Sequence, residues 1–335
     1  MKNNRVTIYD IAKELKISAS TVSRALADHS IISTEVKHLV IDMARQMGYR
    51  KNSIALSLKK GKANTIGVII PRIDRNFFSK TISAIESEAT KAGYNVLICQ
   101  SNEEVRLEKV ALDMLCNGAV EGLLVAVAAE KNNYEHLRKV ESSGIPIVYF
   151  DRYLPDARYK VMIDDYIGAK MATEHLLSLG LRKIVHFSGY LHVHIWNERL
   201  RGYLDAMKDY KITVPKEWIF ESVLREEKGL EIAKQMWQKK DLPEAIFSAS
   251  DYSALGALSF FKMKGLHIPQ DIAITGFANE PFTSYIDPPM TTIEQHPADI
   301  GKAAVRLFIK IQEGYREPCA KLIRSSLIVR QSSMI

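Results

Sequence analysis

Apolar positions recur at the i, i+3, i+4 spacing of amphipathic helices in three short stretches near the start of the chain. This pattern predicts helices over residues 8–15, 19–27 and 34–47. Each expected helix follows a hydroxyl side chain that can cap it, namely Thr7, Ser18 and Ser33. Because only a tight turn separates the first two helices, residues 1–50 are expected to form an all-α helix-turn-helix head.

From residue 65 onward, near-continuous apolar strands alternate with amphipathic helices, which is the pattern of parallel sheets covered on both faces. The expected strands fall in two successive sets, 65–70, 95–100, 122–127 and 146–151, then 183–189, 218–222, 245–250 and 272–277. Two more strands are expected at 291–295 and 327–330. The predicted fold is therefore an N-terminal all-α helix-turn-helix head followed by an α/β body of two doubly wound parallel-sheet subdomains.

The expected domains are a head over 1–50, a hinge helix or linker over 51–63 and a body over 64–335. Within the body, subdomain N is expected at about 64–163 and 292–322, and subdomain C at about 164–291 and 323–335. The chain would cross between them near Asp164, near Asp287 to Pro289, and near Leu322.

The excess basic charge lies in the first 62 residues. The chain has 46 lysines and arginines, 39 acids and a net charge of +7. Residues 1–62 hold 12 of these basic residues and 5 of the acids, so the remainder is neutral. A basic head on a neutral body is typical of a nucleic-acid-binding module joined to a second function. A solvated basic terminus is the alternative.

The second expected helix has an unusually short polar face. Val22, Ala25 and Leu26 form its apolar stripe, while its other positions carry short hydroxyls and one arginine. Such a face allows close approach to the major groove, where hydroxyls bind phosphate oxygens and Arg24 can bind guanine bidentately. An ordinary surface helix is the alternative. The expected DNA contacts of the head are Thr7, Ser18, Ala19, Ser20, Thr21, Ser23 and Arg24.

The run VTIYDIAKELKISASTVSRAL, followed by GY ahead of SIALSL, resembles the head of the lactose-repressor (LacI) family of bacterial transcription regulators. The resemblance continues to the end of the chain and implies a periplasmic-binding-protein-like body. It also implies that residues 54–59 form a hinge helix that enters the minor groove, with Asn52 and Ala55 as contacts and Leu58 as the wedge. The chain departs from the family at Lys51, where proline is usual.

Ligands of doubly wound folds bind at the carboxyl ends of the strands, here in the cleft between the subdomains. The expected contacts there are Arg72, Asp74, Phe77, Phe78, Asp151, Asp164, Trp196, Arg199, Asp251, Phe277 and Asn279. The resemblance implies that Arg199, the first arginine in NERLRGY, binds effector oxygens. Trp196 is expected in a loop. Asp151 as a turn cap and Phe78 as a core residue are the alternatives.

The stretch GFANE places Ala278 where many family members carry an aspartate that clamps effector hydroxyls. One acid fewer, in a cleft near several arginines, favours an acidic or phosphorylated saccharide over a neutral one. Asn279 as a replacement clamp for neutral sugars is the alternative. The arginines concerned are Arg72, Arg75, Arg152 and Arg199.

These observations predict a sequence-specific regulator, a repressor by family resemblance, that binds a palindromic operator in double-stranded DNA as a homodimer under saccharide control. A solute-binding protein of a sugar transporter is the alternative, and the basic head opposes it.

No nucleotide-binding or hydrolase motif is present, and the group His186, His192 and His194 lacks a further metal ligand at matching spacing, so neither catalysis nor a cofactor is expected. No apolar run is long enough to span a membrane, and a cytoplasmic location is expected.

Overall fold

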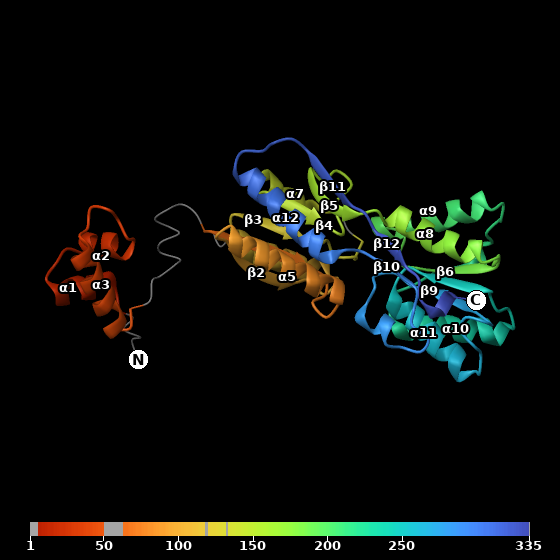
Figure 1. The fold of residues 1–335 in the computed structure, drawn as a ribbon. Helices are drawn as coiled ribbons and strands as arrows, with labels where there is room; N and C mark the ends of the chain where they lie inside the picture. Colours follow the sequence, from red (N-terminus) through yellow and green to blue (C-terminus); the bar gives the residue numbers. More distant parts are fainter. Residues whose placement is uncertain (1–5, 50–62, 118–119, 132, 335) are drawn as a thin grey trace. The chain divides into compact units, whose positions relative to one another are not determined.

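The computed structural model describes residues 6–49, 63–117, 120–131 and 133–334 (Figure 1). Its contacts divide the chain into two compact units, residues 1–63 and residues 64–335. The predicted class, an all-α head followed by a parallel α/β body, is confirmed.

The head contains α1 (Ile8–Leu15), α2 (Ala19–Leu26) and α3 (Thr34–Gln46), so the second and third helices each end one residue earlier than predicted. The hydroxyl caps lie where expected, since the Ser18 hydroxyl accepts the backbone N–H of Thr21 at 3.1 Å. Thr7 instead donates through its backbone N–H and its hydroxyl to Asp10, at 2.8 and 2.7 Å. A small core holds the helices together, with its buried members being Ile11, Ala12, Val22, Ala25, Val40 and Ala44.

Subdomain N is built on a six-stranded parallel sheet with the strand order β11-β5-β4-β3-β1-β2. Its strands are β1 (Thr65–Ile70), β2 (Asn95–Gln100), β3 (Gly122–Val125), β4 (Ile147–Phe150), β5 (Tyr159–Ile163) and β11 (Cys319–Ile323). The helices of this half are α5 (Asn76–Lys91), α6 (Val105–Cys116), α7 (Glu135–Ser142) and α12 (Pro297–Gln312). Strands β5 and β11 were not predicted, because only alternate residues of β5 are buried and β11 is mostly exposed.

Subdomain C is built on a four-stranded parallel sheet with the strand order β7-β6-β8-β9. The strands are β6 (Ile184–Ser188), β7 (Ile219–Glu221), β8 (Ala245–Ser248) and β9 (Ala273–Thr275). Its helices are α8 (Asp165–Ser178), α9 (His194–Asp209), α10 (Glu226–Lys239) and α11 (Asp251–Met263). Because α9 already begins at His194, Trp196 lies in its first turn and not in the loop where it was expected.

Three segments join the two halves of the body. The first follows β5 at Asp164, whose backbone N–H donates to the Ile323 carbonyl at 3.2 Å. The others contain β10 (Thr292–Glu294) and β12 (Ser326–Ile328), which pair antiparallel between the two sheets (Figure 1). The second crossing contains β10, which follows within a few residues the Asp287 to Pro289 stretch near which the crossing was expected. Among the described residues, no helix combines the length and the apolar character needed to cross a membrane.

Candidate functional sites

The exposed face of α2 is the candidate DNA-contacting surface. Val22 and Ala25 are buried against the head core, so the opposite face of the helix carries Ser20 and Arg24, which are both exposed. These two side chains lie one helical turn apart on the same face. Arg24 forms no ion pair with an acid in the described part of the chain, and its guanidinium is therefore available to a ligand.

The hydroxyls at the start of α2 bind one another. The Ser18 oxygen lies 2.7 Å from that of Ser20 and 2.8 Å from that of Thr21, in addition to capping the helix. Ser23 and Thr21 are partly buried, and Ala19 packs against the head core, which leaves its methyl only partly available. Thr7 acts in the cap of α1. The predicted hinge contacts, Asn52, Ala55 and Leu58, lie outside the described residues.

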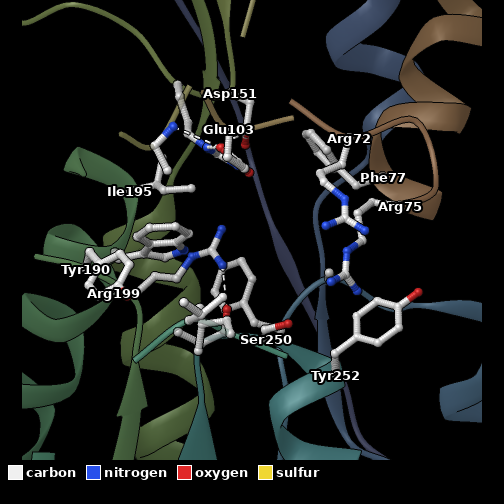
Figure 2. Close-up of a pocket in the computed structure, with 18 of the residues that line it drawn as sticks. Arg72, Arg75, Phe77, Glu103, Asp151, Tyr190, Ile195, Arg199, Ser250 and Tyr252 are labelled. Atoms are coloured by element: carbon white, nitrogen blue, oxygen red, sulfur yellow. Dashed lines mark hydrogen bonds and ion pairs between the residues drawn. The ribbon is translucent and has the colours of Figure 1, made fainter. Parts of the chain in front are cut away.

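A cavity of about 450 Å³ lies in the cleft of the body, at the carboxyl ends of strands from both sheets (Figure 2). This volume is within the range of small-molecule sites. Figure 2 shows Arg72 and Arg75 on one side of the cavity and Arg199 on the other. The sequence-predicted residues that line it are Arg72, Phe77, Phe78, Asp151, Trp196, Arg199 and Phe277.

Four predicted contacts are placed elsewhere. The Asp164 carboxylate caps α8 by accepting the Ile167 backbone N–H at 2.9 Å. Asp251 is fully buried and accepts the Glu280 backbone N–H at 2.8 Å and the Thr292 hydroxyl at 2.6 Å. Neither carboxylate lines the cavity, because each satisfies backbone groups or side chains behind the wall.

Asn279 and Asp74 likewise do not line the cavity. The Asn279 amide donates to Glu294 at 2.7 Å, and its oxygen accepts from Arg330 at 2.8 Å. In this structure Asn279 is therefore not placed as the clamp that the sequence left open. Asp74 is exposed and pairs with Arg72.

Arg199 is anchored deep in the wall. Its Nε donates to Asp165 at 2.7 Å, and its Nη1 donates to the Ala249 carbonyl at 2.7 Å. The guanidinium also lies over the ring of Phe277, 3.7 Å from its centre. Burial raises the pKa of Asp165 to about 7, against the opposing effect of Arg199. The acidic partner of Arg199 is thus Asp165, the residue that follows Asp164.

Arg152 is held in the same way on the other subdomain. Its guanidinium binds both oxygens of Glu103, at 2.6 and 3.0 Å, and lies 3.6 Å from Asp151. Glu103 also accepts the Ala129 backbone N–H at 2.8 Å. These bonds fix the loop between β3 and α7 against the cavity.

The sequence did not identify several lining residues, of which Glu280, Tyr252 and Gln295 are the most informative. Glu280 is 4% exposed, and burial together with the neighbouring Asp251 raises its pKa to about 7. It follows the GFAN stretch directly, so the cavity regains a carboxyl at the position after Asn279. The only available signal was its place just past a strand end.

The three histidines that the sequence places close together, His186, His192 and His194, have separate roles. His186 is buried between the rings of Tyr203 and Phe247, and burial lowers its pKa to about 3. His192 lies 2.7 Å through Nε2 from the Ala129 carbonyl across the cleft, and His194 packs against Tyr153. In the described ranges, no three or more His, Cys, Asp or Glu side chains are grouped so that they could hold a metal ion.

A basic helix-turn-helix unit with an exposed recognition face, joined to a two-subdomain body with a cavity in its cleft, defines a DNA-binding regulator that senses a small molecule.

Comparison with known proteins gives the same assignment. Residues 7–52 match the model for bacterial regulatory proteins of the lacI family, and residues 173–333 match a periplasmic binding protein-like domain. The chain is 31% identical over 330 residues to the HTH-type transcriptional repressor PurR of Actinobacillus pleuropneumoniae serotype 3, covering 97% of this chain and 98% of that protein. The chain belongs to the LacI family of bacterial regulatory proteins, and it is a transcriptional repressor.

Two solved structures show the same fold over nearly the whole chain. The lac repressor dimer bound to operator and the anti-inducer ONPF superposes with a TM-score of 0.89 at 24% identity, covering 99% of this chain and 100% of that one. The lac repressor bound to ONPG in the repressed state superposes with a TM-score of 0.86 at 25% identity, covering 98% and 100%.

Proposed function

We propose that this repressor binds a palindromic operator as a homodimer and that a small saccharide or saccharide derivative in the cavity controls the binding. The observation that carries the effector class is the combination of aromatic faces with charged groups around one cavity. Trp196, which is partly exposed where it lines the cavity, offers a flat surface to a sugar ring. Arg199 and Asp151 can form hydrogen bonds with its hydroxyls.

The dimer has support on the surface of subdomain N. Edge strand β2 and helix α6 expose Leu97, Ile98, Val110 and Met114, which are 43 to 58% accessible. In subdomain C, Met263 and Tyr285 are also exposed, on elements joined by the Lys262–Asp287 ion pair. Exposed apolar groups of this kind are typical of a subunit interface. A two-fold protein then requires a two-fold operator.

The domain division expected from the sequence belongs to this proposal. The head contacts the major groove through Ser20 and Arg24, and Leu58 in the hinge is the wedge in the minor groove. A change in the angle between the body halves alters the spacing of the two hinges in the dimer. We also propose that the protein works in the cytoplasm, where its operator lies, and that it is not an enzyme.

Selection of bound DNA from a random pool, with and without candidate saccharides, tests the proposal. We expect a palindromic sequence whose enrichment changes with one saccharide. Affinity for that operator should fall about 10³- to 10⁵-fold between about 50 and 200 mM salt if about 6–10 phosphates are contacted. The matched control is the body alone, residues 64–335. Operator binding by this control would contradict the assignment of the head and leave a solute-binding protein as the alternative.

Sedimentation of Met114→Glu tests the dimer face. We expect this variant to be monomeric at micromolar concentration and to lose operator affinity. The matched control is Leu322→Glu, because Leu322 is 46% exposed on β11, at the edge of the same sheet opposite β2. A dimer that survives Met114→Glu and dissociates in Leu322→Glu would place the interface on the other edge.

A further inference from the structure

Two arginines on one wall of the cavity are not held by buried acids. Arg72 pairs through Nε and Nη2 with Asp74, whose side chain is 56% exposed. Arg75 forms no ion pair with an acid in the ranges that the structure describes. Its guanidinium lies over the ring of Tyr252, 3.8 Å from the centre. Both groups point into the cavity, one beside the other (Figure 2).

The acids Glu103 and Asp151 are engaged mainly with a third arginine, Arg152, although the charge of Glu103 also acts on Arg72. Glu103 binds Arg152 through both oxygens and also takes a backbone N–H. Asp151 faces the same arginine. The lining holds six basic residues, Arg72, Arg75, Lys131, Arg152, Arg199 and Arg225, and four acids, Glu103, Glu130, Asp151 and Glu280. Two of the basic residues pair with acids outside the lining, Arg199 with the buried Asp165 and Arg72 with the exposed Asp74. The preference for an anion therefore rests on Arg75 and on Arg72, whose exposed partner can be exchanged.

Glu280 already places a carboxyl group near Arg75. This side chain belongs to subdomain C, yet it accepts the backbone N–H of Asn76 at the first turn of α5 in subdomain N. The charge of Arg75 lowers its pKa, but burial and Asp251 outweigh that effect. The start of α5 therefore receives a carboxyl group from across the cleft, and that group is only partly ionised at neutral pH.

We propose that the effector carries an oxyanion, a carboxylate or phosphate ester on a small polyhydroxylated molecule, and that Arg72 and Arg75 bind this oxyanion in exchange for Glu280. The proposal rests on the cavity being the effector site. Guanidinium groups bind carboxylate and phosphate bidentately, and the amides at a helix start add to such a site. Asp74 is exposed, so water solvates its carboxylate when Arg72 leaves it to bind a ligand. No buried charge is then left unpaired.

The test titrates inorganic phosphate into the full chain. The affinity is measured by titration calorimetry and by ³¹P NMR at constant ionic strength. We expect Arg75→Gln and Arg72→Gln to weaken phosphate binding about 10- to 100-fold, the range for the loss of one charged hydrogen-bonding group. The matched control is Arg201→Gln, since Arg201 is 57% exposed and pairs with Glu198 outside the cavity. Glu280→Gln removes the competing carboxylate and should bind phosphate several-fold more tightly. Equal affinities of Arg75→Gln and Arg201→Gln, or no phosphate binding by the unaltered chain at 50 mM, would overturn the proposal.

A second arm separates the two sources of the oxyanion. Glucose, glucuronate and glucose 6-phosphate are titrated into the same variants. We expect one of the two anionic sugars to bind at least 10-fold more tightly than glucose, and only its binding to depend on Arg75. Glucose binding as tightly as both would reject the anionic effector and leave the saccharide proposal standing. Phosphate binding at Arg75 with no effect of any ligand on operator binding would reject the effector role and leave the oxyanion site standing.

Discussion

The two sides of the cavity present arginines that differ in how they are held. Arg199 is 6% exposed and is fixed by Asp165 and a backbone carbonyl. Arg72 is 29% exposed and its partner Asp74 is at the surface, while Arg75 lies over the ring of Tyr252 and forms no ion pair with an acid among the described residues. Buried, paired arginines contribute to the stability of the fold, because removing one partner leaves the other charge buried and uncompensated. Half-exposed arginines can exchange partners at low cost, and such groups are suited to bind a ligand that comes and goes.

The largest difference is expected in stability. Arg199→Met should lower the free energy of unfolding by about 3–5 kcal/mol, because Asp165 is left buried without its partner. The loss should shrink as pH falls from 8 to 5, since Asp165 becomes protonated and no longer carries a charge. Urea unfolding at both pH values measures this. Arg75→Met is the control and should change stability by less than about 1 kcal/mol. A similar loss for both variants would remove the distinction between stabilising and ligand-binding arginines.

Arg24 in the head extends the comparison to an exposed arginine that has no acidic partner among the described residues. Arg24→Ala should relax base preference at one position of each half-site by about 1–3 kcal/mol and leave the unfolding of the head unchanged. Competition binding with single-base operator variants measures the preference. Arg45→Ala, an exposed arginine on α3, is the control. Uniform weakening across all bases would show that Arg24 binds phosphate and reads no base.

Anion binding at Arg75 should depend on pH through Glu280. The groups that face Glu280 are Arg75 and Lys80 on α5, and Asp251 and Tyr252 on α11. With a pKa of about 7, Glu280 is mostly ionised at pH 8 and mostly neutral at pH 6. A sugar carboxylate remains ionised over this range, so its affinity should rise by up to about 10-fold from pH 8 to pH 6.

Glu280→Gln controls for the pH effect, since this variant should show a flat profile by calorimetry. A profile that keeps its slope in Glu280→Gln would assign the effect to another group, with Asp251 the first to be examined because burial raises its pKa to about 6.

The smallest effect is expected at Tyr252. Tyr252→Leu removes the ring under Arg75 and should weaken anion binding about 2- to 5-fold, because an exposed cation–π contact is worth about 0.5–1 kcal/mol. Tyr252→Phe keeps the ring and should bind as the unaltered chain does. If the phenylalanine variant is the weaker of the two, the hydroxyl and not the ring positions Arg75.

The head was predicted almost residue by residue because its structure is determined locally. Caps and i, i+4 apolar pairs lie within one turn of one another, so Ser18 and the Val22 stripe are readable in sequence. In the body, the same reasoning found the alternation of strands and helices and the strand ends that meet at the cavity. It missed β5 and β11, whose exposed positions lack the apolar run of a central strand.

The direction of single side chains in the cleft could not be read from the sequence. Asp164 and Asp165 are neighbours, but the first caps α8 and the second binds Arg199. Their directions differ because Asp164 is the N-cap and Asp165 is the first residue of the helix. Asn279 has a φ of 48°, and its side chain is held by Glu294 and Arg330, behind the wall of the cavity. Long-range partners of this kind decide which side chains reach a ligand, and they have no signature in local spacing.

The connections between the body halves have a consequence for how new specificities arise. β10 and β12 are paired, and the Ser325 hydroxyl donates to the Asp164 carbonyl at 3.3 Å, so all three crossings are bound to one another. Because the crossings are bound to one another, rotation about these segments is the relative motion of the halves that breaks the fewest of these bonds, whichever molecule fills the cleft. Mutations that exchange one ligand for another then need to change only the cavity walls, because the rotation of the two halves depends on the connecting segments and not on the walls.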